Sequence, residues 1–395
     1  MGASIALATT SCVKRPVQHI IPYAKAPQDV TPGVSNFYAS TWYDGIEGYG
    51  ALVRTLEGRP IKMEGNPLHP MNLGAMSSRG HAEVLSLYDP DRLTGPVRNL
   101  QNKTRTNRET ITGTFEDIDA KMAAAFAKGS VAILSSTLPS PSSKAIIADF
   151  QRVFPGTRWV QYDTLGMDAV REASRISYGR AVTPRYRLDQ AKMIVSIDAD
   201  ILGTYLSPVE FTKQWAKIRQ PGPNMARFVM FDSTMSLSGM NADDRIRIKP
   251  SQQLDVVLGL IAEVSRVSKG AASVPAAASN SLKAYAGIAA QLGMEPELFT
   301  KIANQLWDNR GSSLVIAGGL TTQTADAVDL QLAVNALNSI LGNDGKTVDH
   351  DTANFMTREG SSADLATLIA DMKAGKVKTL IIHNLNPVYS LPKDA

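Results

Sequence analysis

Three carboxylates follow predicted strands of this 395-residue chain and are its first candidates for ligand binding. Asp198 and Asp200 come directly after the apolar run 193–197, and Asp232 follows the strand-like run 227–231. Ligands of open parallel sheets bind at the carboxyl ends of the strands, so these carboxylates are placed to face a nucleotide-like ligand. The favoured alternative is that they cap turns and helices. No glycine-rich dinucleotide or Walker-type phosphate sequence accompanies them, which argues against the common nucleoside phosphate sites.

Two further groups of residues offer polar contacts without a recognised catalytic motif. The turn at 318–323, Gly-Gly-Leu-Thr-Thr-Gln, can present backbone amides to a phosphate, and its alternative is an ordinary strand-to-helix turn. Hydroxyls at 135–137 and 140–143 have no motif that supplies a histidine and an acid, so a serine hydrolase is not supported. The densest basic run has two interpretations: a solvated or partner-facing surface, and contact with an anionic ligand. It comprises Arg171, Arg175, Arg180, Arg185 and Arg187.

Metal-ligating residues are sparse in the sequence. Cys12 is the only cysteine, which excludes an intramolecular disulfide and a cysteine-ligated iron–sulfur cluster built from this chain alone. The 41 basic and 37 acidic residues are scattered and give a net charge of +4, so nucleic acid is not an expected partner. A surface or structural role is favoured for the five histidines, which lack metal-ligand spacing: His19, His69, His81, His350 and His383.

The first 36 residues resemble a leader followed by an extended arm. The run 1–12, MGASIALATTSC, is similar to the end of an export signal with a lipoprotein-type cysteine, which makes Cys12 a candidate for lipidation. An incidental free cysteine is the equally weighted alternative. Residues 13–36 are rich in proline and polar side chains and predict an arm that lies on another surface. No later run is long and apolar enough to cross a membrane, so any anchoring through Cys12 would be peripheral.

The rest of the chain predicts an α/β protein with a small β-rich N-terminal domain. Runs 49–56 and 60–64 flank a turn at 57–59 and predict a hairpin, and 80–87 predicts one or two helical turns. Strand-like and helical runs alternate from residue 115, which favours parallel sheets covered by helices. We expect a domain at 37–98, α/β regions at 115–270 and 279–395, and a flexible link at 271–278. An apolar, proline-containing turn after the last strand predicts that the protein continues beyond Ala395.

Four sequence runs in fixed order carry a family resemblance. YDGIEGYGALV (43–53), EGRPIKMEGNPLHP (57–70), GAMSSRG (74–80) and LYDPDRL (87–93) resemble the N-terminal domain of molybdopterin oxidoreductases of the dimethyl sulfoxide reductase family. In that family four cysteines of this domain bind a [4Fe-4S] cluster. The aligned positions here hold Trp42, Gly45, Tyr49 and Ser77, so the resemblance implies that the cluster is lost.

The resemblance continues downstream and concerns the cofactor. Asp198-Ala199-Asp200 and Asp232-Ser233-Thr234 replace the family elements that hold the guanine-dinucleotide tails of the cofactor. We therefore expect no catalytic, cofactor-binding or metal-binding residue in this chain. The domain is retained although its cluster ligands are lost. This combination predicts that the chain is a cofactor-free scaffold.

The leader, the arm and the degenerate domain together are similar to the large subunits of bacterial alternative complex III, a quinol oxidoreductase. This resemblance implies a peripheral position on the periplasmic face of the inner membrane. It also implies a multihaem cytochrome c and quinol-binding integral membrane subunits as partners, with [4Fe-4S] and [3Fe-4S] clusters in a C-terminal domain beyond this sequence. Two alternatives stay open: an active molybdenum or tungsten bis-pterin oxidoreductase without the first cluster, with Ser or Asp as metal ligand, and a soluble α/β ligand-binding protein.

Overall fold

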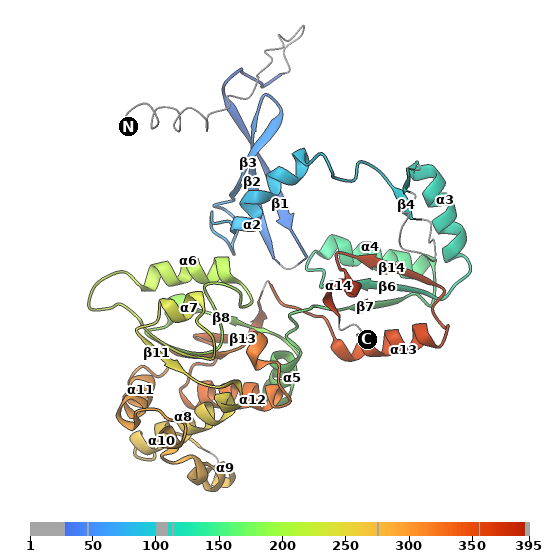
Figure 1. The fold of residues 1–395 in the computed structure, drawn as a ribbon. Helices are drawn as coiled ribbons and strands as arrows, with labels where there is room; N and C mark the ends of the chain where they lie inside the picture. Colours follow the sequence, from blue (N-terminus) through green and yellow to red (C-terminus); the bar gives the residue numbers. More distant parts are fainter. Residues whose placement is uncertain are drawn as a thin grey trace, which may run out of the picture.

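The computed structural model describes residues 28–45, 47–99, 110–112, 114–274, 276–354 and 356–391. Figure 1 shows three parts: an antiparallel sheet near the N-terminus and two α/β units below it. The predicted leader and Cys12 lie outside the described residues. Among the described helices, none has the length and apolar character needed to span a membrane.

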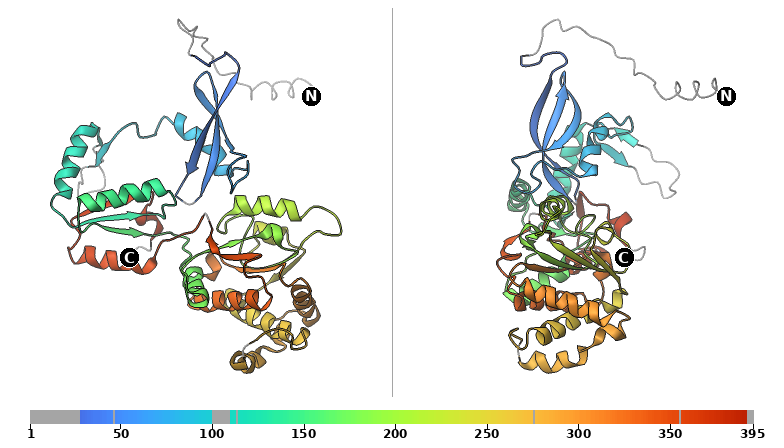
Figure 2. Two further views of the ribbon diagram at one scale, coloured as in Figure 1. Left: turned by 180° about the vertical axis from the view of Figure 1, so that it is seen from behind. Right: turned by 90° about the vertical axis from the view of Figure 1, so that its left-hand side faces the viewer.

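The N-terminal sheet has the order β1-β2-β3 and is antiparallel throughout. Its strands are β1 Ser35–Tyr43, β2 Gly48–Leu56 and β3 Arg59–Gly65, so β1 begins inside the predicted arm. Leu56 pairs with Arg59, and the two residues between them, Glu57 and Gly58, have φ of 50° and 79°. Positive φ at both central residues is the geometry of a tight hairpin turn whose twist matches that of the strands. The predicted hairpin is confirmed, and Figure 2 shows this sheet projecting from the α/β body.

The first α/β unit contains a parallel sheet in the order β11-β10-β9-β12. Its strands are β9 Met193–Ile197, β10 Arg227–Asp232, β11 Asp244–Arg247 and β12 Ser313–Ala317. Alternate residues of a strand point to opposite faces. Accordingly Val195 packs with helices α8 Gln253–Val267, α11 Pro296–Asp308 and α12 Ala327–Ile340, whereas Ile194 packs in the cluster that contains residues of α6 Pro208–Ile218.

The second α/β unit contains a three-stranded parallel sheet in the order β14-β6-β7. Its strands are β6 Val131–Ser135, β7 Arg158–Gln161 and β14 Thr379–His383. Helices α4 Pro141–Val153 and α13 Ser362–Lys373 lie on opposite sides of this sheet, and α3 Phe115–Phe126 precedes it (Figure 1). The parallel sheets with covering helices confirm the predicted fold class.

Both sheets combine strands from the two predicted α/β ranges. β12, from 279–395, pairs with β9, and β14, from the same range, pairs with β6 from 115–270. Neither sheet is therefore built from one range alone. Parallel strands are joined by crossover connections, so a strand near the C-terminus can pair with a strand far away in the sequence. Sequence order therefore does not determine which sheet it joins. The predicted link also contains structure, because α9 begins at Ala276.

Shorter elements complete the described chain. Two antiparallel pairs join β4 Val97–Asn99 to β5 Thr110–Thr112 and β8 Pro184–Tyr186 to β13 Val348–Ala353. The predicted helical turns after residue 80 correspond to α2 Ser78–Ala82 and the 3-10 helix η1 Glu83–Tyr88. The other helices are α5 Asp168–Tyr178, η2 Leu188–Gln190, α7 Leu237–Met240, η3 Pro250–Gln252, α9 Ala276–Leu282, η4 Lys283–Tyr285, α10 Ile288–Gln291, η5 Leu320–Thr322 and α14 Pro387–Ser390.

Candidate functional site: a degenerate cluster domain and a strand-end crevice

Two of the predicted lost ligand positions form an aromatic stack. Trp42 on β1 and Tyr49 on β2 are direct cross-strand partners, and their ring centroids lie 5.9 Å apart at an interplanar angle of 17°. They are 4% and 0% exposed, and both belong to the apolar cluster that covers one face of the first α/β sheet. Burial, with Glu47 nearby, raises the pKa of Tyr49 well above its ordinary value. The stack therefore joins the N-terminal sheet to the α/β core.

The other two positions have backbone roles. Gly45 has φ of 89°, and a Cβ there would lie 3.3 Å from the carbonyl oxygen of Asn384. Ser77 caps α2, because its hydroxyl accepts a hydrogen bond from the Gly80 amide at 3.2 Å. A Cβ on Gly80 would lie 3.4 Å from Cε3 of Trp42, so the capped helix packs beside the aromatic stack.

These four positions do not fit an iron–sulfur cluster. Cluster iron requires about four thiolate ligands, and the positions supply two aromatic rings, a glycine and a capping hydroxyl. Close by, the Arg79 guanidinium pairs with Asp44 at 3.2 Å and with Glu47 at 2.9 Å. Apolar packing and ion pairing hold the domain together at this place.

The structure brings two of the three predicted strand-end carboxylates, and the predicted turn at 318–323, together in one crevice. Asp198 and Asp200 line a cavity of about 240 Å³ together with the turn residues Gly319, Thr321 and Gln323. Asp232 does not line this cavity: it is fully buried and paired with Arg245 at 2.7 Å. Burial raises the pKa of Asp232, and Arg245 opposes that shift.

The carboxylates of the crevice are held by the protein itself. Asp198 accepts hydrogen bonds from the Ser233 amide at 2.9 Å, the Ser233 hydroxyl at 3.2 Å and the Gln253 side chain. Asp200 accepts from the amide and hydroxyl of Ser238 at 2.9 and 2.7 Å. These partners lie 35 to 55 residues away in the sequence, so the side chains of Asp198 and Asp200 hold distant segments together.

The crevice also does not fit the guanine-dinucleotide tail of a molybdopterin cofactor. The ring of Tyr205 lies against Gly318, where a Cβ would be only 1.9 Å from its Cε2, and its hydroxyl donates to the Ala317 carbonyl at 3.3 Å. The remaining 240 Å³ is below the range of about 300–1,000 Å³ that is usual for ligand pockets. Its lining includes Arg358 as the one cation beside two carboxylates, a poor setting for a diphosphate.

The arginines of the predicted basic run contact other residues of the same chain. Arg171 donates to the Glu359 carbonyl, and the other four arginines pair with acidic side chains: Arg175 with Glu172, Arg180 with Asp351, Arg185 with Glu210 and Arg187 with Asp189. His19 lies outside the described residues. Within them, no cluster of three or more metal-ligating side chains occurs.

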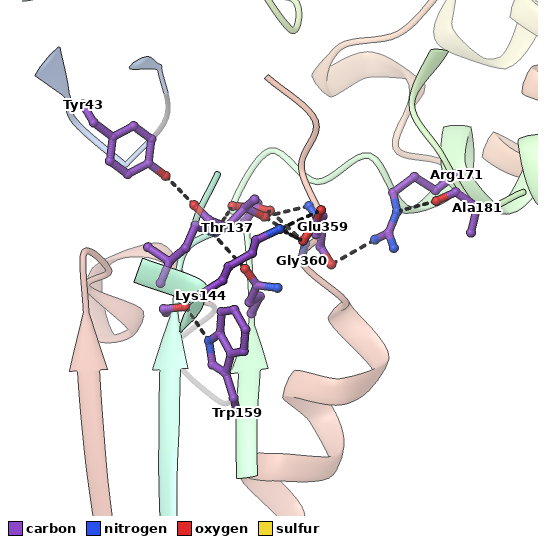
Figure 3. Close-up of polar contacts among 12 residues, drawn as sticks. Tyr43, Thr137, Lys144, Trp159, Arg171, Ala181, Glu359 and Gly360 are labelled. Carbon is purple, nitrogen blue, oxygen red and sulfur yellow. Dashed lines mark hydrogen bonds and ion pairs between the residues drawn. The ribbon is translucent and has the colours of Figure 1, made fainter. Parts of the chain in front are cut away.

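No sequence motif predicts the polar junction between the three parts that Figure 3 shows. The Thr137 hydroxyl, after β6, donates to Asp163 at 2.5 Å and accepts from the amides of Glu359 and Gly360 at 2.7 and 3.1 Å. Tyr43, at the end of β1, donates to the Thr137 carbonyl. Loop residues lack periodicity, so their partners cannot be read from sequence spacing.

Comparison with known proteins found sequence relatives of this chain. No family model matches the chain. The chain is 25% identical over 378 residues to the menaquinone reductase, molybdopterin-binding-like subunit of Nitratidesulfovibrio vulgaris, covering 88% of this chain and 52% of that protein. It is 24% identical over 389 residues to a nitrate reductase of Shewanella frigidimarina, covering 85% of this chain and 41% of that protein.

The fold agrees with a solved structure as well. Acetylene hydratase from Pelobacter acetylenicus superimposes with a TM-score of 0.56 at 13% identity, covering 78% of this chain and 42% of that one. The chain thus spans about half the length of the curated relatives or less. The chain is thus similar in sequence to a molybdopterin-binding-like subunit and to a nitrate reductase, and it shares the fold of acetylene hydratase.

Proposed function

We propose that this chain is a cofactor-free scaffold within a respiratory quinol oxidoreductase complex of the alternative complex III type. The observation that carries the proposal is the buried stack of Trp42 and Tyr49, at two positions where the sequence resemblance implies cluster ligands. The relative from Nitratidesulfovibrio vulgaris, described as molybdopterin-binding-like and as part of a menaquinone reductase, supports a place in quinone-linked respiration.

The proposal assigns a mechanical role to this part of the protein. Its retained shape docks an electron-transfer domain with [4Fe-4S] and [3Fe-4S] clusters, and its partners are a multihaem cytochrome c and quinol-binding membrane subunits. The complex stands on the periplasmic face of the inner membrane, with lipidated Cys12 as an additional anchor. The Tyr43–Thr137 contact supports this role, because it fixes the N-terminal sheet to the second α/β unit.

Metal analysis of the purified 395-residue chain tests the proposal. We expect molybdenum, tungsten and iron each far below one atom per chain, and no iron–sulfur signal in electron paramagnetic resonance. Stoichiometric molybdenum or tungsten with extractable pterin would overturn the scaffold and favour the alternative. Isolation of the native complex from membranes, followed by haem c staining, tests the proposed partners separately.

An active molybdenum or tungsten oxidoreductase is the second candidate. The similarity to a nitrate reductase favours it, together with the carboxylates that remain at the strand ends. In this candidate Ser or Asp would supply the oxygen ligand of the metal. The filled crevice beside Tyr205 is the observation that places it second.

A further inference from the structure

Arg358 carries a buried positive charge and forms no ion pair with a carboxylate within the described part of the chain. The side chain is 6% exposed, and its guanidinium donates to the Leu165 carbonyl. The carboxylates of Asp163 and Glu47 stabilise its charge electrostatically from beyond ion-pair distance. Burial lowers the pKa of Arg358, which reflects how poorly this place solvates a cation.

The guanidinium borders three adjoining cavities of about 240, 10 and 640 Å³. The smallest has room for about one water molecule. The largest lies between α2 and α6, and its charged lining consists of Arg79, Lys213 and Arg358 against the single carboxylate of Glu47. Lys213 forms no ion pair with a described residue, so this cavity has an excess of positive charge.

The cavity of 240 Å³ has the opposite balance. Asp198 and Asp200 line it, and the only cation in its lining is again Arg358. An anion beside Arg358 is therefore favoured on the α2–α6 side and disfavoured on the strand-end side. The α2–α6 cavity therefore differs in charge from the strand-end crevice, where a dinucleotide tail would lie.

The segment that carries Arg358 is held rigidly. The amides of Glu359 and Gly360 donate to Thr137, and Lys144 pairs with Glu359 at 3.0 Å (Figure 3). A Cβ on Gly360 would lie 2.6 Å from the amide nitrogen of Asp163, so the backbone passes in close contact. A guanidinium fixed in this way pays little conformational entropy when it binds a ligand.

We infer that Arg358 and Lys213 form an oxyanion-binding site in the cavity between α2 and α6. The planar fork of the guanidinium suits two oxygens of one phosphate or carboxylate group, and the ammonium of Lys213 adds a second charge. Hydroxyls of Ser77, Ser78 and Thr212 in the lining are further donors. The site goes beyond the proposed scaffold role and does not depend on it.

Calorimetric titration of the 395-residue chain with inorganic phosphate, at constant ionic strength set by chloride, tests the inference. We expect saturable binding of about one phosphate per chain. Arg358→Gln should weaken it at least about tenfold, because charge-assisted bidentate contacts are lost. Arg358→Lys should give an intermediate affinity, and Lys213→Gln a smaller loss. Arg180→Gln is the matched control, since Arg180 is exposed, pairs with Asp351 and lines none of these cavities.

Absence of saturable phosphate binding to the folded wild-type chain would overturn the inference, as would unchanged binding by Arg358→Gln. A parallel titration with acetate shows whether the site prefers carboxylate or phosphate, and preference for either one supports an oxyanion site. Melting temperatures separate binding from a structural role: phosphate should stabilise the wild type and not Arg358→Gln. If Arg358→Gln does not fold, the phosphate affinities of Arg358→Lys and Lys213→Gln test the inference, and both should be weaker than that of the wild type.

Discussion

The indole of Trp42 stacks on the phenol ring of Tyr49 across the first two strands, with 5.9 Å between the ring centroids. Both rings are buried in the apolar cluster that also contains Phe211 of α6 and Ile194 of the α/β sheet. Two positions at which the sequence resemblance implies lost cluster ligands therefore hold part of the hydrophobic core. The N-terminal sheet and the first α/β unit are held together by this shared core.

Truncation of the stack should destabilise the protein strongly. We expect Trp42→Ala to lower the free energy of unfolding by about 3–5 kcal/mol, because a large buried ring is removed and a cavity remains. Urea denaturation followed by circular dichroism measures the change. Phe37→Ala on the same strand is the control, since Phe37 is 53% exposed, and it should change the value by less than about 1 kcal/mol. Equal effects of the two substitutions would contradict a core role for Trp42.

The strands of the α/β body could be predicted from the sequence because they are short apolar runs. The apolar runs 131–135, 193–197, 313–317 and 379–383 coincide with β6, β9, β12 and β14. β6, β9 and β12 are fully buried, and fully buried strands are near-continuous apolar runs, so their limits can be predicted without tertiary information. β14 lies at the edge of its sheet, and its last two residues are exposed. The strand order was not visible, because β14 joins β6 across more than half of the chain.

The candidate site was predictable only where it follows strand ends. Asp198 and the turn at Gly319 meet in one cavity because both follow neighbouring parallel strands. Arg358 and Thr137 lie in loops, where the partner of a side chain depends on how distant segments meet. Their burial could not be derived from periodicity, so the oxyanion site and the polar junction emerged only from the structure.

Gly318 should tolerate no side chain while Tyr205 fills the crevice. A Cβ there would lie 1.9 Å from the tyrosine ring, so we expect Gly318→Ala to destabilise the chain by about 1–3 kcal/mol through overpacking. Gly95→Ala is the control, because nothing lies within 4 Å of its Cβ position. Combining Gly318→Ala with Tyr205→Leu should recover part of the loss in thermal denaturation. A double variant that is less stable than the sum of both single changes would contradict direct contact.

The polar junction should depend on the hydroxyl of Thr137. Thr137→Val leaves the Glu359 amide without its acceptor, whereas the Gly360 amide still donates to Asp163 at 3.0 Å. We expect a loss of about 1–3 kcal/mol, because one donor becomes unsatisfied. Hydrogen exchange measured by mass spectrometry should become faster in residues 357–361. Thr367→Val is the matched control, because Thr367 lies on the exposed face of α13 and bonds only within its helix. Unchanged exchange in 357–361 would contradict the junction.

Tyr205 should make the protein sensitive to alkaline pH. Burial raises the pKa of its phenol from 10.0 to about 12, so the folded state favours the protonated ring. The stability that this group contributes is fully present below pH 10 and is lost as the pH rises from about 10 to about 12, by about 3 kcal/mol. Tyr205→Phe should therefore flatten the decline of stability in this window and remove one tyrosine from the late part of the absorbance titration at about 295 nm. Tyr38→Phe, at an exposed position of β1, is the control for removing a phenol hydroxyl. An identical loss of stability with pH in the wild type and Tyr205→Phe would show that another group controls alkaline unfolding.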